Sequence, residues 1–407
     1  MPKRYTGIDV LTAARNRISL VFDHFEKFYV AFSGGKDSTV LTHLVMEQAI
    51  KRGKKVGLMY IDFEAQYADT IAHVQEVYEE YRDYIDPHWV CVPMLLRNAV
   101  TNYEPRWLCW DPEKKDLWIR PMPENVKHVE DYPFCLPGME FEEFIVLFAE
   151  WYGDGAKTAG FIGIRAQESL HRYCAIATWE KKNLMFRGQR WTTKTVDECY
   201  NVYPIYDWLT EDIWRFHAMC PGKSHNLIYD KMQMAGVPLS QQRLCQPFGD
   251  DQRRGLWLYH ILEPQTWARL VVRVNGANSG ANYIQESGNV TGYDHITLPP
   301  GHTWRSFTNL LLQTMPKKTR EHYLPRFKKF MVGWRRRGYP SIPDECPPEL
   351  EAKCWAPSWK RMCRVLLRND WWCGGLGMGQ PKSKAYERYK QMKREKRLAL
   401  AEAKKKA

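Results

Sequence analysis

The 407-residue sequence lacks the features that would place it in a membrane or in an oxidising compartment. No apolar run reaches the roughly 20 residues that a membrane-spanning helix requires. Met1-Pro2-Lys3-Arg4 leads into polar residues rather than into the apolar core of a signal peptide. The eleven cysteines form no Cys-x-x-Cys pair, and a chain of this length does not depend on disulfides. We therefore expect a cytoplasmic protein with reduced thiols and no membrane partner.

The sequence also lacks the GxxxxGK[ST] spacing of a Walker phosphate loop. It has instead an apolar stretch at 28–32, the turn Ser33-Gly34-Gly35-Lys36-Asp37-Ser38 and a helical run from Thr39 to Ile50. Glycines let the backbone approach a ligand closely, and the N–H groups at a helix start attract anions. Lys36 adds a positive charge there. The stretch predicts a phosphate-binding turn, because an ordinary helix cap would explain only one of these residues.

Negative charge is scarce at one end of the chain. The net charge is +12, and residues 381–407 supply +8 of it with eleven Lys or Arg against three Glu. An anionic partner such as a nucleotide or a nucleic acid is therefore plausible. Three basic runs of the C-terminal half are candidates for a nucleic-acid face, and solvated helix faces are the alternative. These runs are Lys317-Lys318, Lys328-Lys329 and Arg335-Arg336-Arg337.

Apolar stretches alternate with helical patterns through the N-terminal half. Helices are predicted at 8–26, 67–84 and 140–151, and further strands at 55–61, 89–94 and 158–164. This alternation is typical of an α/β fold with a doubly wound, mostly parallel sheet. Ligands of such sheets bind beyond the carboxyl ends of the strands. The turn 33–38 and Asp62, which follows the strand at 55–61, should therefore lie on the same rim.

The chain is predicted to comprise three parts. Residues 1–225 are predicted to form the α/β domain, with an insertion or lid at about 97–135 that is rich in Trp and Pro. Residues 226–380 are predicted to form a second, mainly helical domain, and 381–407 a basic tail. The positive charge of this tail is explained either by a solvated, partly helical segment or by a segment that binds nucleic acid.

Three motifs carry a resemblance to a known family. The turn 33–38 resembles the SGGKDS pyrophosphate-binding loop (PP-loop) of the adenine-nucleotide α-hydrolase-like superfamily, which has a Rossmann-like fold. Members include ATP pyrophosphatases, the sulfate adenylyltransferase small subunit and phosphoadenosine phosphosulfate (PAPS) reductases. Gly163-Ile164-Arg165-Ala166-Gln167-Glu168-Ser169 resembles the GxRxxES-type segment of the PAPS reductase-like family, and 201–214 resembles the segment that follows it.

The resemblance implies that the chain binds ATP or PAPS and acts at the α-phosphate or the phosphosulfate. Lys36, Arg165 and the N–H groups of the glycine turn would stabilise the charge that develops there. Asp37 is the candidate Mg²⁺ ligand, because this hard cation prefers carboxylates beside phosphates. Asp62 would bind ribose or metal, with helix capping as the alternative. The predicted nucleotide-binding residues are Ser33, Gly34, Gly35, Lys36, Asp37, Ser38, Asp62, Gly163 and Arg165.

The C-terminal half resembles the uncharacterised domain of the IbrA branch of this family, named for a phage and prophage co-activator. The family's reductases carry a Glu-Cys-Gly-[IL]-His stretch, and the nearest match here, Trp372-Cys373-Gly374-Gly375-Leu376, lacks both the Glu and the His. Two hypotheses follow: a nucleotide α-hydrolase or transferase, or a nucleotide-sensing regulator that engages DNA or a partner protein. Four C-terminal cysteines either bind a metal or are buried thiols: Cys346, Cys354, Cys363 and Cys373.

The basic tail generates a first testable prediction. Deleting residues 381–407 should leave nucleotide binding intact, because every predicted site residue lies upstream. The deletion should weaken any nucleic-acid binding and reduce its salt dependence, since fewer cations would then meet phosphates. Titrations at several salt concentrations would measure both effects. An unchanged slope of log affinity against log salt would contradict a role for the tail.

Overall fold

The computed structural model describes residues 7–101, 103–136, 138–177, 184–196, 198–220, 222–244, 248–249, 255–278, 297–352, 355–378 and 394. The chain divides into two compact units. The first comprises residues 1–95, 108–244 and 383–407, and the second comprises 96–107 and 245–382. The first unit thus continues to Leu244, past the domain boundary predicted at residue 225. Apart from Arg394, the basic tail lies outside the described residues.

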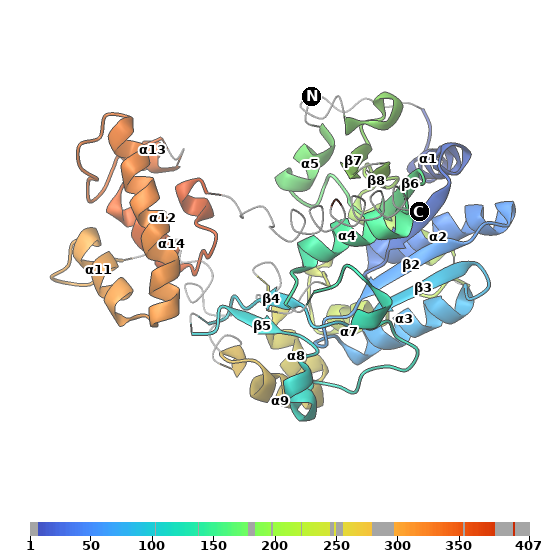
Figure 1. Cartoon of the computed structure of the whole chain (residues 1–407), viewed down its shortest axis with the longest axis horizontal. Coiled ribbons are helices and arrows are strands. Elements are labelled where there is room, and N and C mark those ends of the chain that lie inside the picture. The colour runs from blue at the N-terminus through green and yellow to red at the C-terminus, as the bar shows by residue number, and fades with distance from the viewer. Residues whose placement is uncertain are drawn as a thin grey trace, which may run out of the picture. The chain divides into compact units, whose positions relative to one another are not determined.

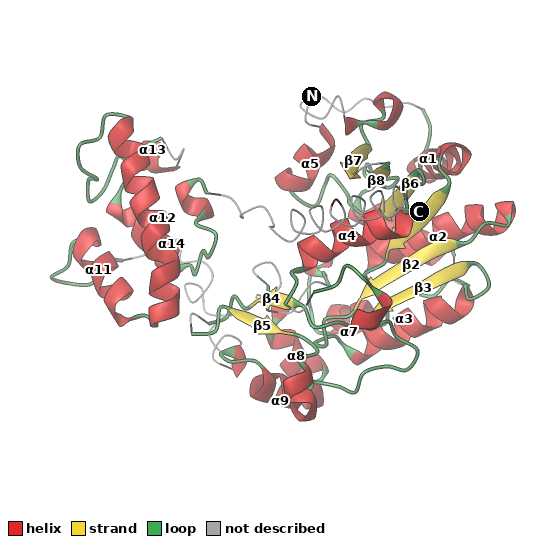
Figure 2. Ribbon diagram, in the orientation of Figure 1, coloured by secondary structure: helices red, strands yellow, loops and turns green. Residues whose placement is uncertain are grey.

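A six-stranded sheet forms the centre of the first unit, with helices flanking it (Figures 1 and 2). Its order is β3-β2-β1-β6-β8-β7. Neighbours from β3 to β8 are parallel, and only β7 runs antiparallel, against β8. The strands are β1 (Lys27–Ala31), β2 (Val56–Ile61), β3 (Ile85–Val90), β6 (Thr158–Ile162), β7 (Thr192–Val196) and β8 (Cys199–Val202). The predicted doubly wound, mostly parallel α/β fold is confirmed.

The helices of the first unit agree with the apolar periodicity of the sequence. They are α1 (Val10–His24), α2 (Lys36–Arg52), α3 (Ala68–Glu80), α4 (Phe141–Gly153), α5 (Leu170–Ala177), α6 (Thr210–Met219) and α7 (Ile228–Met234). Helix α2 contacts β1 and β6, while α1 and α6 pack against α2. Helix α2 is therefore buried along most of its length. Its N-terminus lies beyond the carboxyl end of β1, which is the rim where such sheets bind ligands.

The second unit is mainly helical within the described residues. Its helices are α8 (Trp257–Leu262), α9 (Pro264–Arg273), α11 (Trp304–Thr314), α12 (Lys317–Arg336), α13 (Pro348–Ala352) and α14 (Trp359–Leu367). An apolar core of α11, α12 and α14 side chains holds the bundle together, with Tyr323, Phe327 and Met362 at its centre. The two short strands β4 (Leu95–Arg97) and β5 (Arg106–Leu108) pair with each other. No helix in the described part of the chain is long and apolar enough to cross a membrane.

Part of the tryptophan-rich segment predicted as an insertion packs against the loop that follows β2. The indole of Trp110 is buried and donates to the carbonyl of Asp62 at 2.7 Å. The Glu64 carboxylate accepts from the backbone N–H groups of Trp110 at 2.7 Å and Ile119 at 3.1 Å. Arg120 forms an ion pair with Asp62. These contacts anchor Trp110 and Ile119 in the core of the first unit, while residues 112–117 between them are exposed.

The Arg120–Asp62 pair gives a stability prediction. Arg120→Met should lower the free energy of unfolding by about 3–5 kcal/mol, because it leaves a buried carboxylate without its cation. The Asp62 side chain is fully buried, so water cannot replace the guanidinium. Urea denaturation of the whole chain would measure the change.

Arg82→Met is the matched control. Arg82 pairs with Glu79 at 2.7 Å, but both side chains are about two-thirds exposed, at 67% and 70%. Such a pair contributes about 1 kcal/mol or less. If Arg120→Met cost no more than this control, the structural role of the buried pair would be refuted.

Candidate functional site

The predicted phosphate turn connects β1 to α2, and its own side chains fix its shape. Gly34 has a φ of +68°, which an L side chain rarely adopts, and a Cβ there would lie 2.9 Å from the Thr70 methyl group. The hydroxyls of Ser33 and Ser38 are 2.9 Å apart, and the Gly35 N–H donates to Ser33 Oγ at 3.3 Å. The turn therefore holds its backbone N–H groups at the start of a helix, as the sequence predicts.

Gly163 lets the end of β6 lie directly against this helix start. A Cβ on Gly163 would be 3.2 Å from the Ser38 nitrogen and 3.3 Å from the Asp37 carbonyl carbon. Both neighbours are backbone atoms, so a side chain could not be accommodated by a rotamer change. This close approach places the residues after β6, including Arg165, beside the first turn of α2.

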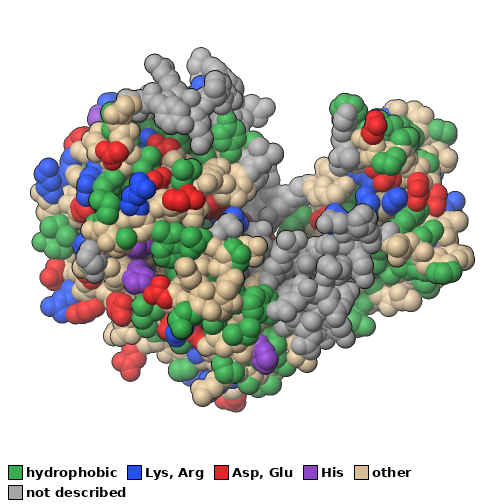
Figure 3. All heavy atoms as spheres, turned by 180° about the vertical axis from the view of Figure 1, so that it is seen from behind, with side chains coloured by type: hydrophobic (Ala, Val, Ile, Leu, Met, Phe, Trp, Pro, Cys, Tyr) green, Lys and Arg blue, Asp and Glu red, His purple; other side chains and the backbone are tan. Residues whose placement is uncertain are grey.

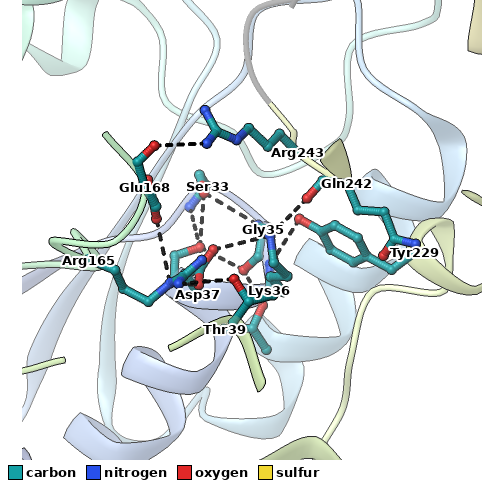
Figure 4. Close-up of polar contacts among 12 residues, drawn as sticks. Ser33, Gly35, Lys36, Asp37, Thr39, Arg165, Glu168, Tyr229, Gln242 and Arg243 are labelled. Atoms are coloured by element: carbon teal, nitrogen blue, oxygen red, sulfur yellow. Dashed lines mark hydrogen bonds and ion pairs between the residues drawn. The ribbon is translucent and has the colours of Figure 1, made fainter. Parts of the chain in front are cut away.

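The charged side chains of the motifs meet on Asp37 (Figure 4). Arg165 Nε lies 2.5 Å from Asp37 Oδ1, and Lys36 Nζ lies 3.4 Å from Asp37 Oδ2. Glu168 Oε1 is 3.6 Å from Arg165 Nε. Arg165 is only 3% exposed. The structure thus brings together Lys36, Asp37 and Arg165 from two motifs that are more than a hundred residues apart in the sequence.

Lys36 is buried, with its cationic head held by groups from the end of the first unit. Its Nζ donates to the Gln242 carbonyl at 2.8 Å, and its backbone N–H donates to the Tyr229 hydroxyl at 3.0 Å. Burial lowers the pKa of Lys36, and the neighbouring Asp37 carboxylate opposes that shift. A weakly solvated cation of this kind interacts strongly with an oxyanion that enters the same space.

Sequence reasoning missed the residues between 226 and 244 that support the turn. The Asn226 amide donates to the Gly34 carbonyl at 2.9 Å and to Thr70 Oγ1 at 3.0 Å. Arg243 donates to the Glu168 carbonyl at 3.1 Å (Figure 4). Together with Tyr229 and Gln242, these residues tie the 226–244 segment to the site. Nothing local in the sequence indicates such contacts, because the partners are far apart along the chain.

The structure does not bring Asp62 into this network. Its carboxylate accepts from the Trp89 indole at 3.0 Å and from the Glu64 N–H at 3.0 Å, and it pairs with Arg120. Both oxygens are therefore engaged by protein donors in a buried environment. This arrangement favours a structural role for Asp62 over contact with ribose or metal.

Asp37 as placed does not suit a Mg²⁺ ion. Each of its oxygens faces a cation, Arg165 on one side and Lys36 on the other, so a divalent ion there would meet two positive charges. The described residues also contain no group of three His, Cys, Asp or Glu side chains arranged to hold a metal. The carboxylate instead positions the two cations.

Two histidines lie behind the helix start and are neutral at pH 7. Burial lowers the pKa of His73 to about 3 and that of His217 to about 4. His73 Nε2 lies 2.9 Å from Thr39 Oγ1, whose hydroxyl also donates to the Gly35 carbonyl. These rings add no charge to the site, so its cations are the lysine and the arginines.

The described cysteines are free thiols, and several are strongly disfavoured as thiolates. Burial raises the pKa of Cys135 and Cys363 to about 11 and that of Cys373 to about 12. Of the four C-terminal cysteines proposed as a metal set or as buried thiols, Cys363 and Cys373 are buried and Cys346 is partly buried. Cys354 lies outside the described residues.

Two family models match the chain. One is described as the phosphoadenosine phosphosulfate reductase domain and matches residues 27–94, and the other, domain of unknown function DUF3440, matches residues 236–355. The Escherichia coli K12 protein YbdN is 40% identical over 390 residues, which cover 94% of this chain and 93% of that protein. The protein MJ0066 of Methanocaldococcus jannaschii is 25% identical over 223 residues, or 53% of this chain and 37% of that protein.

Solved structures show weaker likeness. The PAPS reductase of Candida auris, in a phosphate complex, has a TM-score of 0.28 and 12% identity, covering 54% of this chain and 84% of that one. The U34-tRNA thiolase NcsA of Methanococcus maripaludis, solved with its 4Fe-4S cluster, has a TM-score of 0.30 and 12% identity, covering 72% of this chain and 82% of that one.

Because Gly163 lies so close to the backbone of α2, we expect that adding a single methyl group at this position weakens nucleotide binding. Gly163→Ala should displace the first turn of α2 and weaken binding of an adenine nucleotide by about ten-fold or more, because the added Cβ meets backbone atoms. Calorimetric titration with ATP would measure the affinity. Gly222→Ala is the matched control, since a Cβ there meets nothing within 4 Å. Equal affinities in the two variants would disprove the importance of this approach.

Proposed function

Because this chain belongs to the family of Escherichia coli YbdN and carries a PP-loop PAPS reductase domain, we propose that it binds an adenine nucleotide in the turn 33–38 and acts at its α-phosphate. The nucleotide is ATP, with PAPS as the alternative ligand of the same site. We place this activity in the cytoplasm, where the free thiols of the chain would remain reduced.

One observation carries the proposal: two buried cations converge on a glycine-rich helix start. Lys36 is 6% exposed and Arg165 is 3% exposed, and both contact the same carboxylate of Asp37. The N–H groups of the first helical turn have no acceptor within their own helix. Donors and cations of this kind, fixed in advance in a water-poor site, stabilise oxyanions better than mobile surface charges do.

The proposed reaction breaks the bond between the α-phosphorus of ATP and its bridging oxygen to the β-phosphate. A nucleophilic atom of an acceptor attacks the α-phosphorus, the adenylyl group moves to that acceptor, and pyrophosphate leaves with the bonding electron pair. Lys36 and Arg165 stabilise the negative charge on the transferring and leaving oxygens. Asp37 orients both cations through the contacts of 3.4 and 2.5 Å.

Ligand entry requires Lys36 to exchange partners. Its Nζ now donates to the Gln242 carbonyl, and its N–H donates to the Tyr229 hydroxyl. A phosphate oxygen is a stronger acceptor than a neutral carbonyl or hydroxyl, since hydrogen bonds between charged groups are about twice as strong. Phosphate binding therefore competes with the 226–244 segment for the same donors.

Three buried thiols, one of them in the stretch that resembles the reductase motif, favour chemistry at phosphorus over reduction of a sulfonucleotide. Reduction requires a thiolate nucleophile, and burial raises the pKa of Cys135, Cys363 and Cys373 to about 11, 11 and 12. These three groups remain protonated at pH 7. The stretch around Cys373 that resembles the reductase motif therefore offers no ready nucleophile.

A second candidate function is a nucleotide-controlled regulator of the IbrA branch, acting with DNA or a partner protein. The competition at Lys36 favours it, because bound nucleotide would loosen a segment that leads into the DUF3440 match at 236–355. In this case binding, rather than turnover, is the functional event. Pyrophosphate release distinguishes the two functions.

Lys36→Ala and Asp37→Ala should each abolish release of pyrophosphate from ATP. Loss of the lysine removes a charged hydrogen bond worth about 1.5–3 kcal/mol, so ATP affinity should also fall by about 10- to 150-fold. Loss of the aspartate frees both cations from their fixed positions. Calorimetry with ATP and Mg²⁺ and a pyrophosphate assay would measure binding and turnover.

Lys55→Ala, which removes an exposed lysine of the same unit, is the control and should behave as the wild type. Wild-type affinity in both site variants would refute the site. Tight ATP binding by the unmodified chain without any pyrophosphate, in the presence of nucleic acid and candidate acceptors, would establish the regulator instead.

A further inference from the structure

Helix α12 (Lys317–Arg336) presents one apolar face to the core of the second unit and carries exposed cations on both flanks of the opposite face. The buried side is made by Thr319, Tyr323, Phe327, Phe330 and Trp334. Six exposed cations occupy the rest of the helix: Lys317, Lys318, Lys328, Lys329, Arg335 and Arg336. These include residues of all three basic runs noted in the sequence, so one helix gathers them onto one surface.

The six cations form two rows. Lys317, Lys328 and Arg335 are separated by eleven and seven residues, and Lys318, Lys329 and Arg336 repeat the same spacing one position later. At 3.6 residues per turn, steps of eleven and seven residues are about three and two turns, so each row runs along one side of the helix. Successive positions differ by about 100°, which keeps the rows apart.

A narrow ridge separates the rows. Glu321, Pro325 and Val332 project between them, directly opposite the buried side of the helix, and all three are exposed. With a rise of about 1.5 Å per residue, the 18 steps from Lys317 to Arg335 span about 27 Å. The outer face is therefore a ridge bordered on both sides by positive charge, with one pair of cations at the start of the helix and two pairs in its second half.

In the described part of the chain, the cations of α12 lack most of the neighbouring carboxylates that an ordinary solvated helix face carries. Such faces usually carry both signs at positions three or four residues apart. Here Lys317 lies 4.0 Å from Glu321, and the other five cations have no carboxylate within salt-bridge distance among the described residues. In the view of Figure 3, positive and negative side chains are interspersed over the first unit.

We propose that the outer face of α12 binds the two phosphate backbones that border a groove of double-stranded DNA. The major groove of B-DNA is about 12 Å wide and admits an α-helix. Two rows of cations on either side of a ridge match two phosphate strands on either side of a groove. The deep, narrow major groove of duplex RNA does not admit a helix in this way.

The geometry argues against an anionic membrane as the partner. A helix that lies in a membrane interface inserts a broad apolar face among the lipids. The apolar face of α12 is instead buried against α11 and α14, with Tyr323 and Phe327 at 1% and 2% exposure.

The proposed binding is independent of DNA sequence, because contacts to phosphates carry no information about the bases. This proposal does not depend on the nucleotide site.

The test replaces four of the cations in the full-length chain. Lys328→Gln, Lys329→Gln, Arg335→Gln and Arg336→Gln are combined, and binding to a labelled DNA duplex of about 25 base pairs is followed by fluorescence anisotropy between roughly 50 and 200 mM salt. Each lost phosphate contact should reduce the slope of log affinity against log salt by about 0.9, or about 3.6 for four. Affinity near the lower salt concentration should fall at least ten-fold. All four side chains are exposed, so the fold should persist, as circular dichroism can verify.

The matched control carries the same change in net charge at exposed lysines of the first unit, Lys51→Gln, Lys54→Gln, Lys55→Gln and Lys115→Gln. It should keep the wild-type slope. Equal slopes in the two variants would overturn the assignment to α12, since only total charge would then matter. Binding to vesicles of anionic phospholipid without binding to the duplex would overturn it in favour of a membrane. Tighter binding to single strands, unchanged by the α12 variant, would overturn it in favour of another surface.

Discussion

The position of the Asp37 carboxylate between Arg165 and Lys36 is the interaction on which the site depends. One anion holds two cations that come from different motifs, and all three side chains are largely removed from water. In such surroundings a charge without a partner is costly, so the three groups stabilise one another and keep the cations at the helix start. The close approach at Gly163 makes the interaction possible, because it brings the end of β6 onto the first turn of α2.

The support of this arrangement comes from residues that follow the parallel part of the sheet in the sequence. Asn226 holds the Gly34 carbonyl, Tyr229 accepts from the Lys36 N–H, and the Gln242 carbonyl accepts from the Lys36 ammonium group. All three contacts to the turn are polar hydrogen bonds. A fully apolar packing would hold the turn more firmly but would leave no donors to exchange.

The positions of strands and helices could be predicted from the sequence wherever the chain has a long run of apolar residues. The strands β1, β2 and β6 and the helices α1 and α4 lie close to their predicted positions. The third strand was predicted at 89–94 but lies at Ile85–Val90, because its first half contains Asp86 and Pro87. A proline is tolerated there since β3 is the edge strand of the sheet. The β7–β8 hairpin was missed, because Thr192–Val196 is polar and also lies at an edge.

The proximity of Lys36, Asp37 and Arg165 agrees with their places in two motifs that each follow a strand of the parallel sheet. Asp62 looked equivalent to them from its place at a strand end, but its carboxylate is engaged by Arg120, a partly buried arginine from a distant segment. Asn226, Tyr229 and Gln242 could not be predicted, since their contacts arise only when the chain returns to the rim after nearly two hundred residues.

The continuation of the first unit to Leu244 affects how the nucleotide domain can be separated from the rest of the protein. A shortened chain that ends at residue 225, the predicted domain boundary, would keep the whole sheet but lose every support that the turn receives from beyond it. Such a fragment would fold with an exposed, poorly held helix start. The compact unit that contains the candidate site therefore includes the first residues of the match to DUF3440, so the two family models overlap one structural unit rather than dividing the protein between them.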